Sequence, residues 1–374
     1  MKKSFSYIIQ IIIVFFLITI YSCENPDPTL KDAFKDHFEI GVAVNPKIVS
    51  GKDSNALEIV KTHFNGVTAE NAMKWALIHP KPGVYNFEPA DKFVEFAEGN
   101  NIFVTGHCLV WHSQTPRWVF EDEMGNPTVR DTLLQRMKDH IFTVVGRYKG
   151  RVKCWDVVNE PTADDGQVRK SRWYEIIGED YIQKAFEYAR EADPEALLIL
   201  NDYSLPNQPK RECMVGIIKD LQAKGIRIDG IGLQAHYLLD YPTMEDLEAS
   251  IVAFAELGPR IMITEMDIDV LPRAGFDRGA DIAYREEYRA KLNPYTEGLP
   301  DSVASQLAKQ YGDMFTVFVK HADKIDRVTL WGVHDGQSWK NNFPVRGRTN
   351  YPLLFDRDYQ PKLAFYAVME AAGR

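Results

Sequence analysis

The sequence between residues 152 and 160 reads VKCWDVVNE, a mostly apolar run that ends in an amide and a carboxylate. Residues 260–265 read RIMITE and repeat the form, again ending in glutamate. Near-continuous apolar runs of this length predict strands of a parallel sheet that is covered on both faces. Eight such runs recur along the chain: Ile40–Val44, Gly66–Thr68, Ile102–Gly106, Val152–Val158, Ala196–Leu200, Ile228–Leu233, Ile261–Thr264 and Val328–Trp331.

The segments between these runs have the periodicity of amphipathic helices. Leu134, Met137 and Ile141 follow one another at three- and four-residue spacing, which places them on one helix face. Thr243 and Asp246 predict a capped helix start. Alternation of eight strands with helices predicts a single-domain (β/α)8 TIM barrel of the α/β class. An open doubly wound sheet is the rival, but no GxGxxG turn follows the first strand.

The composition narrows the class of partner. The chain has 374 residues and a net charge of −9, without a block of Lys and Arg. This argues against a nucleic-acid partner, so we expect none. No CxxC or HExxH spacing is present, and we expect neither a metal nor a cofactor. We also expect a monomer.

The N-terminus has the features of a targeting segment. Two lysines precede an apolar stretch between Tyr7 and Tyr21, and Ser22-Cys23 follows. The stretch is short for a membrane span and typical of a signal peptide. Residues 20–23 resemble a bacterial lipobox, which predicts cleavage after residue 22 and lipidation of Cys23.

The predicted organisation is therefore a signal peptide over residues 1–22, a linker over 23–30 and a barrel over 31–374. The expected location is the cell envelope, through a lipid anchor in the membrane, with plain secretion as the alternative. Cys108, Cys154 and Cys213 remain after Cys23. Three cysteines cannot all pair internally, and the sequence leaves open whether two of them form a disulfide.

Polar and aromatic residues gather where the predicted strands end. In a barrel all these ends lie on one face, the face that carries active sites. The clustering predicts a wide polar cleft with aromatic walls. The residues concerned are Glu70, Asn71, Lys74, His107, Trp111, Asn159, Glu160, Tyr203, Gln234, His236, Glu265, Asp267, Trp331 and Trp339.

Two of these residues suit one kind of chemistry. Cleavage of a glycosidic bond needs a carboxyl group that donates a proton and a second that acts as nucleophile or base. Glu160 and Glu265 each end an apolar run at the expected face. A lone glutamate at a strand end is more often a surface or salt-bridge residue, so the pair and its context carry the argument.

Four sequence blocks identify a resemblance. Residues 68–75 (TAENAMKW), 106–112 (GHCLVWH), 155–160 (WDVVNE) and 263–268 (ITEMDI) resemble, in order, the signature blocks of family-10 glycoside hydrolases. The resemblance covers residues 31–374. It implies a (β/α)8 barrel and a retaining endo-1,4-β-xylanase that acts on xylan and xylo-oligosaccharides. Retention would place the two carboxyl groups about 5–5.5 Å apart.

The resemblance also implies roles for individual residues. Glu160 would be the acid/base and Glu265 the nucleophile. Asn159 can donate to the sugar 2-hydroxyl, His236 can hydrogen-bond Glu265, and Asp267 can orient His236 from the same strand by i, i+2 alternation. The remaining residues would bind substrate: Glu70, Asn71, Lys74, His107, Trp111, Gln234, Trp331 and Trp339, with Tyr203 stacking a sugar on the leaving-group side.

Two other functions remain open at this level. One is a related barrel endoglucanase or mannanase, which also ends its fourth strand in Asn-Glu. The other is a non-catalytic glycan-binding surface lipoprotein, which would need one of the two carboxylates replaced. The segment Leu271–Tyr311 is expected to form a loop and helix over the rim of the cleft.

Overall fold

The computed structural model describes residues 28–272 and 290–373. Within these ranges eight parallel strands close into a barrel in the order β10-β1-β2-β3-β5-β6-β7-β9, and β9 pairs with β10 to complete the circle. The predicted (β/α)8 barrel is therefore confirmed. The strands are β1 (Glu39–Val44), β2 (Gly66–Ala69), β3 (Phe103–Gly106), β5 (Cys154–Asn159), β6 (Leu197–Asp202), β7 (Gly230–Leu233), β9 (Arg260–Asp269) and β10 (Ile325–Leu330).

Two further strands, too short to be predicted, extend the sheet at the carboxyl end of the barrel. β4 (Val110–Trp111) pairs with β5, and β8 (His236–Leu238) pairs with β9. The run that ends at Glu265 was predicted to stop there, but β9 continues to Asp269. The extension brings His236 opposite Asp267 in the parallel register.

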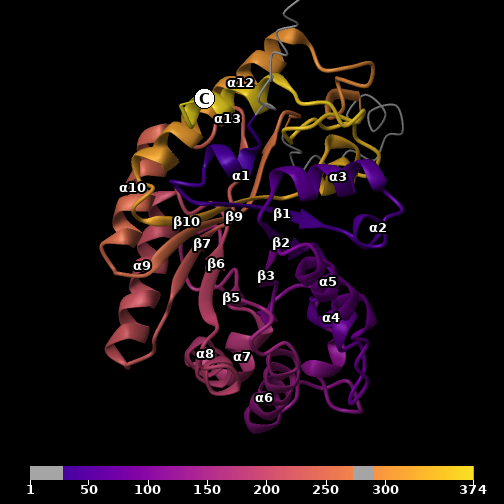
Figure 1. The fold of residues 1–374 in the computed structure, drawn as a ribbon. Coiled ribbons are helices and arrows are strands. Elements are labelled where there is room, and N and C mark those ends of the chain that lie inside the picture. The colour runs from indigo at the N-terminus through magenta and orange to yellow at the C-terminus, as the bar shows by residue number, and fades with distance from the viewer. Residues whose placement is uncertain (1–27, 273–289, 374) are drawn as a thin grey trace, which may run out of the picture.

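Helices surround the strands (Figure 1). Their starts follow local chemistry: Thr243 caps α10 by accepting from the backbone N–H of Asp246, and Asn207 caps α9 by accepting from that of Lys210. The helices are α1 (Leu30–Ala33), α2 (Pro46–Val49), α3 (Ser54–His63), α4 (Trp75–Ile78), α5 (Glu88–Gly99), α6 (Arg130–Arg147), α7 (Arg172–Ile177), α8 (Tyr181–Ala192), α9 (Gln208–Ala223), α10 (Met244–Ala255), α12 (Asp301–Lys320) and α13 (Leu363–Ala371).

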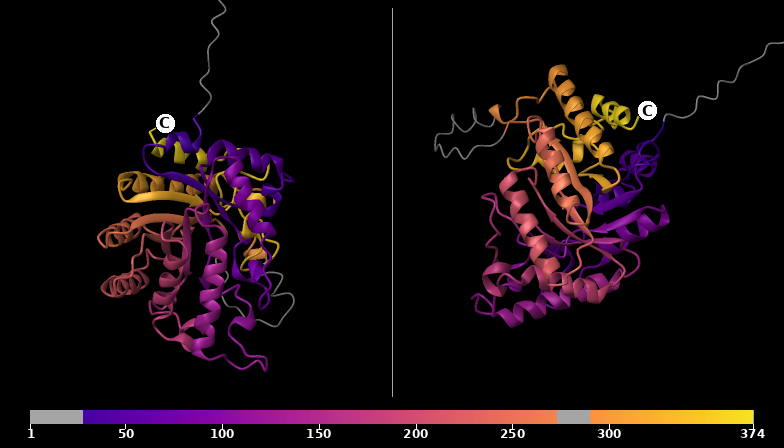
Figure 2. Two further views of the ribbon diagram at one scale, coloured as in Figure 1. Left: turned by 60° about the horizontal axis from the view of Figure 1, so that its bottom comes forward. Right: turned by 90° about the vertical axis from the view of Figure 1, so that its left-hand side faces the viewer.

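The helix expected over the cleft rim is instead part of the outer ring. α12 begins at Asp301 and packs against α10 and α13, and the C-terminal end of the chain lies beside it (Figure 2). Its buried side chains, such as Leu307, Met314 and Phe318, belong to the main hydrophobic core, which explains its place. The rest of the expected rim segment includes residues 273–289, which lie outside the described residues.

Neighbouring strands pack closely at several strand glycines, among them Gly106 and Gly232. A Cβ on Gly106 would lie 2.1 Å from the ring of Trp155, and one on Gly232 would lie 2.2 Å from Oδ1 of Asn201. Side chains of neighbouring strands therefore fill the space that these glycines leave. The second contact lies beside the carboxylates described below.

Several smaller questions are answered by the fold. Cys108, Cys154 and Cys213 are free thiols, so no disulfide forms among them. None of the helices in the described part of the chain is long and apolar enough to cross a bilayer. The proposed signal peptide, the lipidation site Cys23 and most of the linker precede the described residues.

Candidate active site

Glu265 lies at the centre of a hydrogen-bonded cluster at the carboxyl end of the barrel. Its side chain is 6% exposed. Asn201 donates from Nδ2 to Oε1 of Glu265 at 2.8 Å, and Nε2 of His236 lies 3.3 Å from Oε2. His107 approaches Oε1 to 3.9 Å through Nδ1. Donors and positive charge thus surround this carboxylate on more than one side.

The surroundings keep Glu265 ionised. Burial alone would raise its pKa, but His107, His236 and Lys74 together outweigh burial and hold the pKa below the ordinary glutamate value. An ionised carboxylate is the form that can attack a carbon centre.

His236 is a hydrogen-bonded, charged partner of Glu265. Burial lowers its pKa, but Asp267 and Glu265 on either side reverse the effect and raise the pKa to about 9. His236 is therefore a cation at neutral pH, donating from Nδ1 to Asp267 at 2.9 Å and from Nε2 to Glu265. The predicted contact, in which Asp267 accepts a hydrogen bond from His236 and so orients it, is therefore present.

Asp267 is held in turn by its own donors. It is fully buried, and Trp339 donates from Nε1 to its Oδ2 at 2.7 Å. Burial raises its pKa, but His236, Lys340 and Trp339 outweigh this and leave the pKa below the ordinary aspartate value. The indole of Trp339 is therefore fixed against the acid that orients His236.

Glu160 lies at the end of β5 and is joined to Glu265 by amide side chains. Its backbone N–H donates to the carbonyl of Asn201 at 2.8 Å, and its φ is 58°, in the left-handed region. Gln234 donates from Nε2 to Oε1 of Glu160 at 3.2 Å and to Oδ1 of Asn159 at 3.1 Å. Asn201 donates to that same Oδ1 at 2.9 Å. One continuous network, Glu160–Gln234–Asn159–Asn201–Glu265, therefore connects the two carboxylates.

Glu160 differs from Glu265 in its neighbours. Its side chain is 14% exposed, and Nδ1 of His112 lies 3.7 Å from Oε2. Burial lowers the pKa of His112 in spite of Glu160, helped by Arg169 and Lys210. His112, to which the sequence assigned no role, is therefore a mainly neutral neighbour of Glu160.

A second group of the predicted residues lies after β2 and β3. Lys74 donates from Nζ to Oδ1 of Asn71 at 3.1 Å, and the same Nζ lies 5.1 Å from the ring centroid of Trp111. Burial raises the pKa of Glu70, although Lys74 and Asn71 oppose it. His107 contacts Trp111 at 6.4 Å between ring centroids. These residues form a polar group beside Glu265.

Two tryptophans that follow β10 pack against the histidines beside Glu265. Trp331 packs edge-on to His107 at 5.2 Å and to His236 at 6.2 Å, and Trp339 lies 5.0 Å from His236. Trp331 is buried and Trp339 is partly exposed. The predicted aromatic residues thus lie against the histidines that contact Glu265.

Tyr203 lies apart from these groups, after β6. Its hydroxyl donates to Asp164 and accepts from Nη2 of Arg169 at 2.9 Å. Arg169 also donates to the backbone carbonyl of Glu160 at 2.9 Å. Tyr203 is therefore connected to Glu160 rather than to Glu265.

Sequence reasoning missed three contributors to this site. Asn201 follows the fifth predicted strand directly, and pairing of β6 with β5, which sets it opposite Asn159, could have indicated it. Asp156 lies 2.8 Å from His107, and the buried position within an apolar strand was the only signal. Arg169 offers no signal, because its contact depends on the folding of the loop after β5.

Proteins of known family are similar to this chain over most of its length. The sequence model of Glycosyl hydrolase family 10 matches residues 29–371. The chain belongs to glycoside hydrolase family 10. It is 44% identical to Endo-1,4-beta-xylanase A of Xylanibacter ruminicola, over 92% of this chain and 94% of that protein. It is also 44% identical to an endo-1,4-beta-xylanase of Geobacillus stearothermophilus, over 91% and 98% of the two chains.

Solved structures agree with the sequence comparison. A family-10 endoxylanase from a sugarcane soil metagenome superposes with a TM-score of 0.86 and 45% identity, over 92% of this chain and 99% of that one. A mutant chain solved in complex with xylotriose superposes with a TM-score of 0.82 and 39% identity, over 91% of this chain and 99% of that one.

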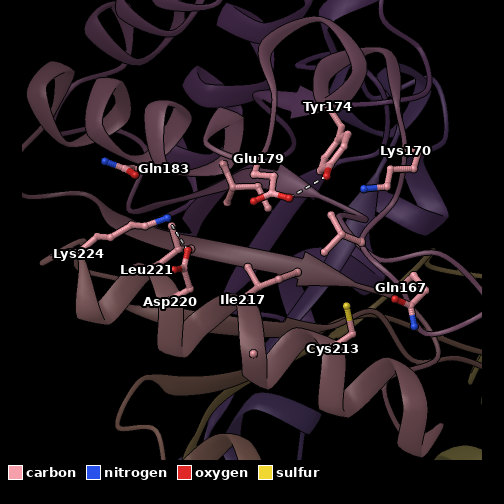
Figure 3. Close-up of a pocket in the computed structure, with 13 residues that line it drawn as sticks. Gln167, Lys170, Tyr174, Glu179, Gln183, Cys213, Ile217, Asp220, Leu221 and Lys224 are labelled. Atoms are coloured by element: carbon pink, nitrogen blue, oxygen red, sulfur yellow. Dashed lines mark hydrogen bonds and ion pairs between the residues drawn. The ribbon is translucent and has the colours of Figure 1, made fainter.

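A separate groove lies outside the strand-end cluster. It has a volume of about 450 Å³, and its lining includes Gln183 of α8, Cys213 of α9 and Lys224 just after α9 (Figure 3). None of the sequence-predicted site residues lines it.

Proposed function

We propose that this protein is a retaining endo-1,4-β-xylanase that hydrolyses internal bonds of xylan and xylo-oligosaccharides. The observation that carries the proposal is the network joining an ionised, buried Glu265 to a more exposed Glu160. Two carboxylates with different surroundings suit the two roles that retaining glycosidases require.

The reaction follows from these roles in two steps. The Glu265 carboxylate attacks the anomeric carbon and forms an ester bond, while the bond to the leaving oxygen breaks and Glu160 gives that oxygen its proton. Glu160 then takes a proton from water, whose oxygen attacks the same carbon and breaks the ester. Asn159 would donate from its side-chain amide to the sugar 2-hydroxyl.

Substrate contacts are proposed for the surrounding residues. Glu70, Asn71, Lys74, His107, Trp111, Gln234, Trp331 and Trp339 would bind the glycone sugars, and Tyr203 would stack a leaving-group sugar. Xylan differs from cellulose by the missing hydroxymethyl arm at C5, and bulky tryptophans near the glycone would exclude that arm.

Replacing the nucleophile tests the mechanism. We expect Glu265→Ala to lose at least about 10³-fold of the activity on xylan because the covalent route is gone. Added azide or formate should partly restore the rate and give inverted product. Near-wild-type hydrolysis by this variant would refute the assignment.

A substrate panel separates the alternatives. Reducing-sugar release from xylan, cellulose and mannan by the wild type should be highest on xylan. Higher activity on cellulose or mannan would favour an endoglucanase or mannanase, and no release from any of them would favour a non-catalytic glycan-binding lipoprotein.

We further propose that residues 1–22 are a lipoprotein signal peptide, 23–30 a linker and 31–374 the catalytic barrel, which acts as a monomer in the cell envelope. The support is the lipobox-like stretch before Cys23. The wild type should fractionate with membranes, and Cys23→Ala should release active enzyme or block processing. A wholly soluble wild type that begins at another residue would rule lipidation out.

A further inference from the structure

Helix α9 carries a lysine that lies wholly inside the protein. Lys210 is 1% exposed, and its Nζ lies 3.1 Å from Oδ1 of Asp202, whose side chain is 0% exposed. Charged side chains are almost never fully buried unless they are paired, and burying a pair is costly. The side chain of Asn207 caps the helix by accepting from the backbone N–H of Lys210. The cap therefore fixes the backbone from which the Lys210 side chain extends to Asp202 at the end of β6.

Asp202 connects this lysine to two segments of the active face. Its Oδ1 also accepts from the backbone N–H of Tyr203 at 2.8 Å. Its Oδ2 accepts from both the N–H and the hydroxyl of Thr162, at 2.9 and 2.7 Å. Thr162 is two residues beyond Glu160. One buried carboxylate therefore fixes the backbone after β6 and the turn that follows Glu160.

Lys210 also supports the ring of Tyr203. Its Nζ lies 3.3 Å from the ring centroid, a close cation–π contact. Arg169 donates to the Tyr203 hydroxyl and to the carbonyls of Glu160 and Thr162. The ring is thus held at its hydroxyl by Arg169 and on one face by Lys210. Tyr203 is partly exposed, which leaves its remaining surface for a ligand.

We propose that Lys210 and Asp202 form a positioning pair for the leaving-group side of the site. The pair places the Tyr203 ring and the Thr162 turn so that a sugar on the leaving-group side is bound while Glu160 faces the bond to be cut. Neither residue touches the reacting atoms, so both act through Tyr203 and Thr162. The inference rests on the proposed xylanase function.

The pair predicts a loss that depends on the leaving group. Lys210→Met removes the cation under the ring, and the double variant Asp202→Asn with Lys210→Met removes both buried charges at nearly constant volume. The double variant leaves no unpaired buried charge, so it should fold even where the single variant does not. Cys213→Ser, on the same helix but lining the groove of Figure 3, is the matched control.

Two substrates distinguish a loss of leaving-group binding from a general loss of folded protein. Xylohexaose occupies the leaving-group side with sugars, whereas β-xylobiosyl fluoride has a leaving group without a ring and with little need of a proton. We expect kcat/KM on xylohexaose to fall by about 10-fold or more in the double variant, mainly through KM, and to stay within about 3-fold on the fluoride. Cys213→Ser should match the wild type on both.

Other outcomes overturn the inference. An equal loss on both substrates would mean that the pair acts only on the fold, and an unchanged kcat/KM on xylohexaose would mean that it does not position the leaving-group side. If the wild type hydrolyses neither substrate, the proposed xylanase function itself fails, and the inference fails with it.

Discussion

Replacing His236 by asparagine removes the cation between Asp267 and Glu265. Burial lowers the pKa of His236, but the two carboxylates raise it overall from 6.5 to about 9. At about 1.4 kcal/mol per pKa unit, the raised pKa corresponds to about 3 kcal/mol of folding stability. The side chain is 14% exposed, so solvent screening reduces this value little.

The sign of the pH dependence follows from the raised pKa. The folded protein binds the proton more tightly than the unfolded chain, so the stabilisation is fully present below about pH 6.5 and is lost as the pH rises through about 9. Glu265 and Asp267 have lowered pKa values, and their contribution is lost only as the pH falls into the acid range. Among Glu265, His236 and Asp267, His236 is therefore the group whose protonation state changes between about pH 6 and 9.5.

Urea unfolding followed by tryptophan fluorescence, at about pH 6, 7.5 and 9.5, measures the effect. The difference in unfolding free energy between wild type and His236→Asn should shrink by about 3 kcal/mol over this range. His112→Asn is the control. The pKa of His112 is lowered, so protonation of this histidine contributes no folding stability that would be lost as the pH rises. A wild-type-to-variant difference that stays constant with pH would show that His236 is not a cation in the folded protein.

Three further predictions concern single residues. Glu160→Ala should be nearly inactive on xylan but keep the first step, release of the phenol, on aryl xylobiosides with acidic phenols, because that leaving group needs no proton donor; an equal loss on both substrates would contradict its role. The wild type should prefer aryl xylobioside over aryl cellobioside by roughly 10–200-fold in kcat/KM, and Trp339→Ala should reduce this ratio. An unchanged ratio would mean that other residues discriminate between xylose and glucose. Gly106→Ala should lower the unfolding free energy by about 1–3 kcal/mol, because its Cβ would meet Trp155 at 2.1 Å, and an unchanged urea midpoint would contradict this.

The sequence was sufficient for the barrel because apolar runs mark buried parallel strands. It was insufficient where polar residues continue a strand: β9 extends through Asp267 and Asp269, whose side chains are buried among His236, Trp339 and Arg348. A strand segment with buried aspartates has the sequence pattern of a loop, and only the folded chain shows the side chains that pair with those aspartates. The extension matters, because it carries Asp267 to His236.

The candidate site was predictable to the same extent. Residues at strand ends converge by topology, which is why Glu160, Glu265 and His236 lie together. Arg169 and Lys210 reach the site from a loop and a helix, and only the folded chain shows that the first binds the Glu160 carbonyl and the second lies beneath Tyr203. Burial of a lysine cannot be read from periodicity, since the sequence places it in a first helical turn.

The histidine between two acids also has a consequence for the timing of turnover. In the resting enzyme, the positive charge of His236 is shared by Glu265 and Asp267. In the proposed mechanism Glu265 would be neutral once it is an ester, and Asp267 alone would then balance that charge. Together the three groups would then change from a net charge of −1 to zero, with the His236 cation still beside the ester oxygen, where it would stabilise the carboxylate as it leaves. Formation of the ester would thus create the charge arrangement that favours its hydrolysis in the second step.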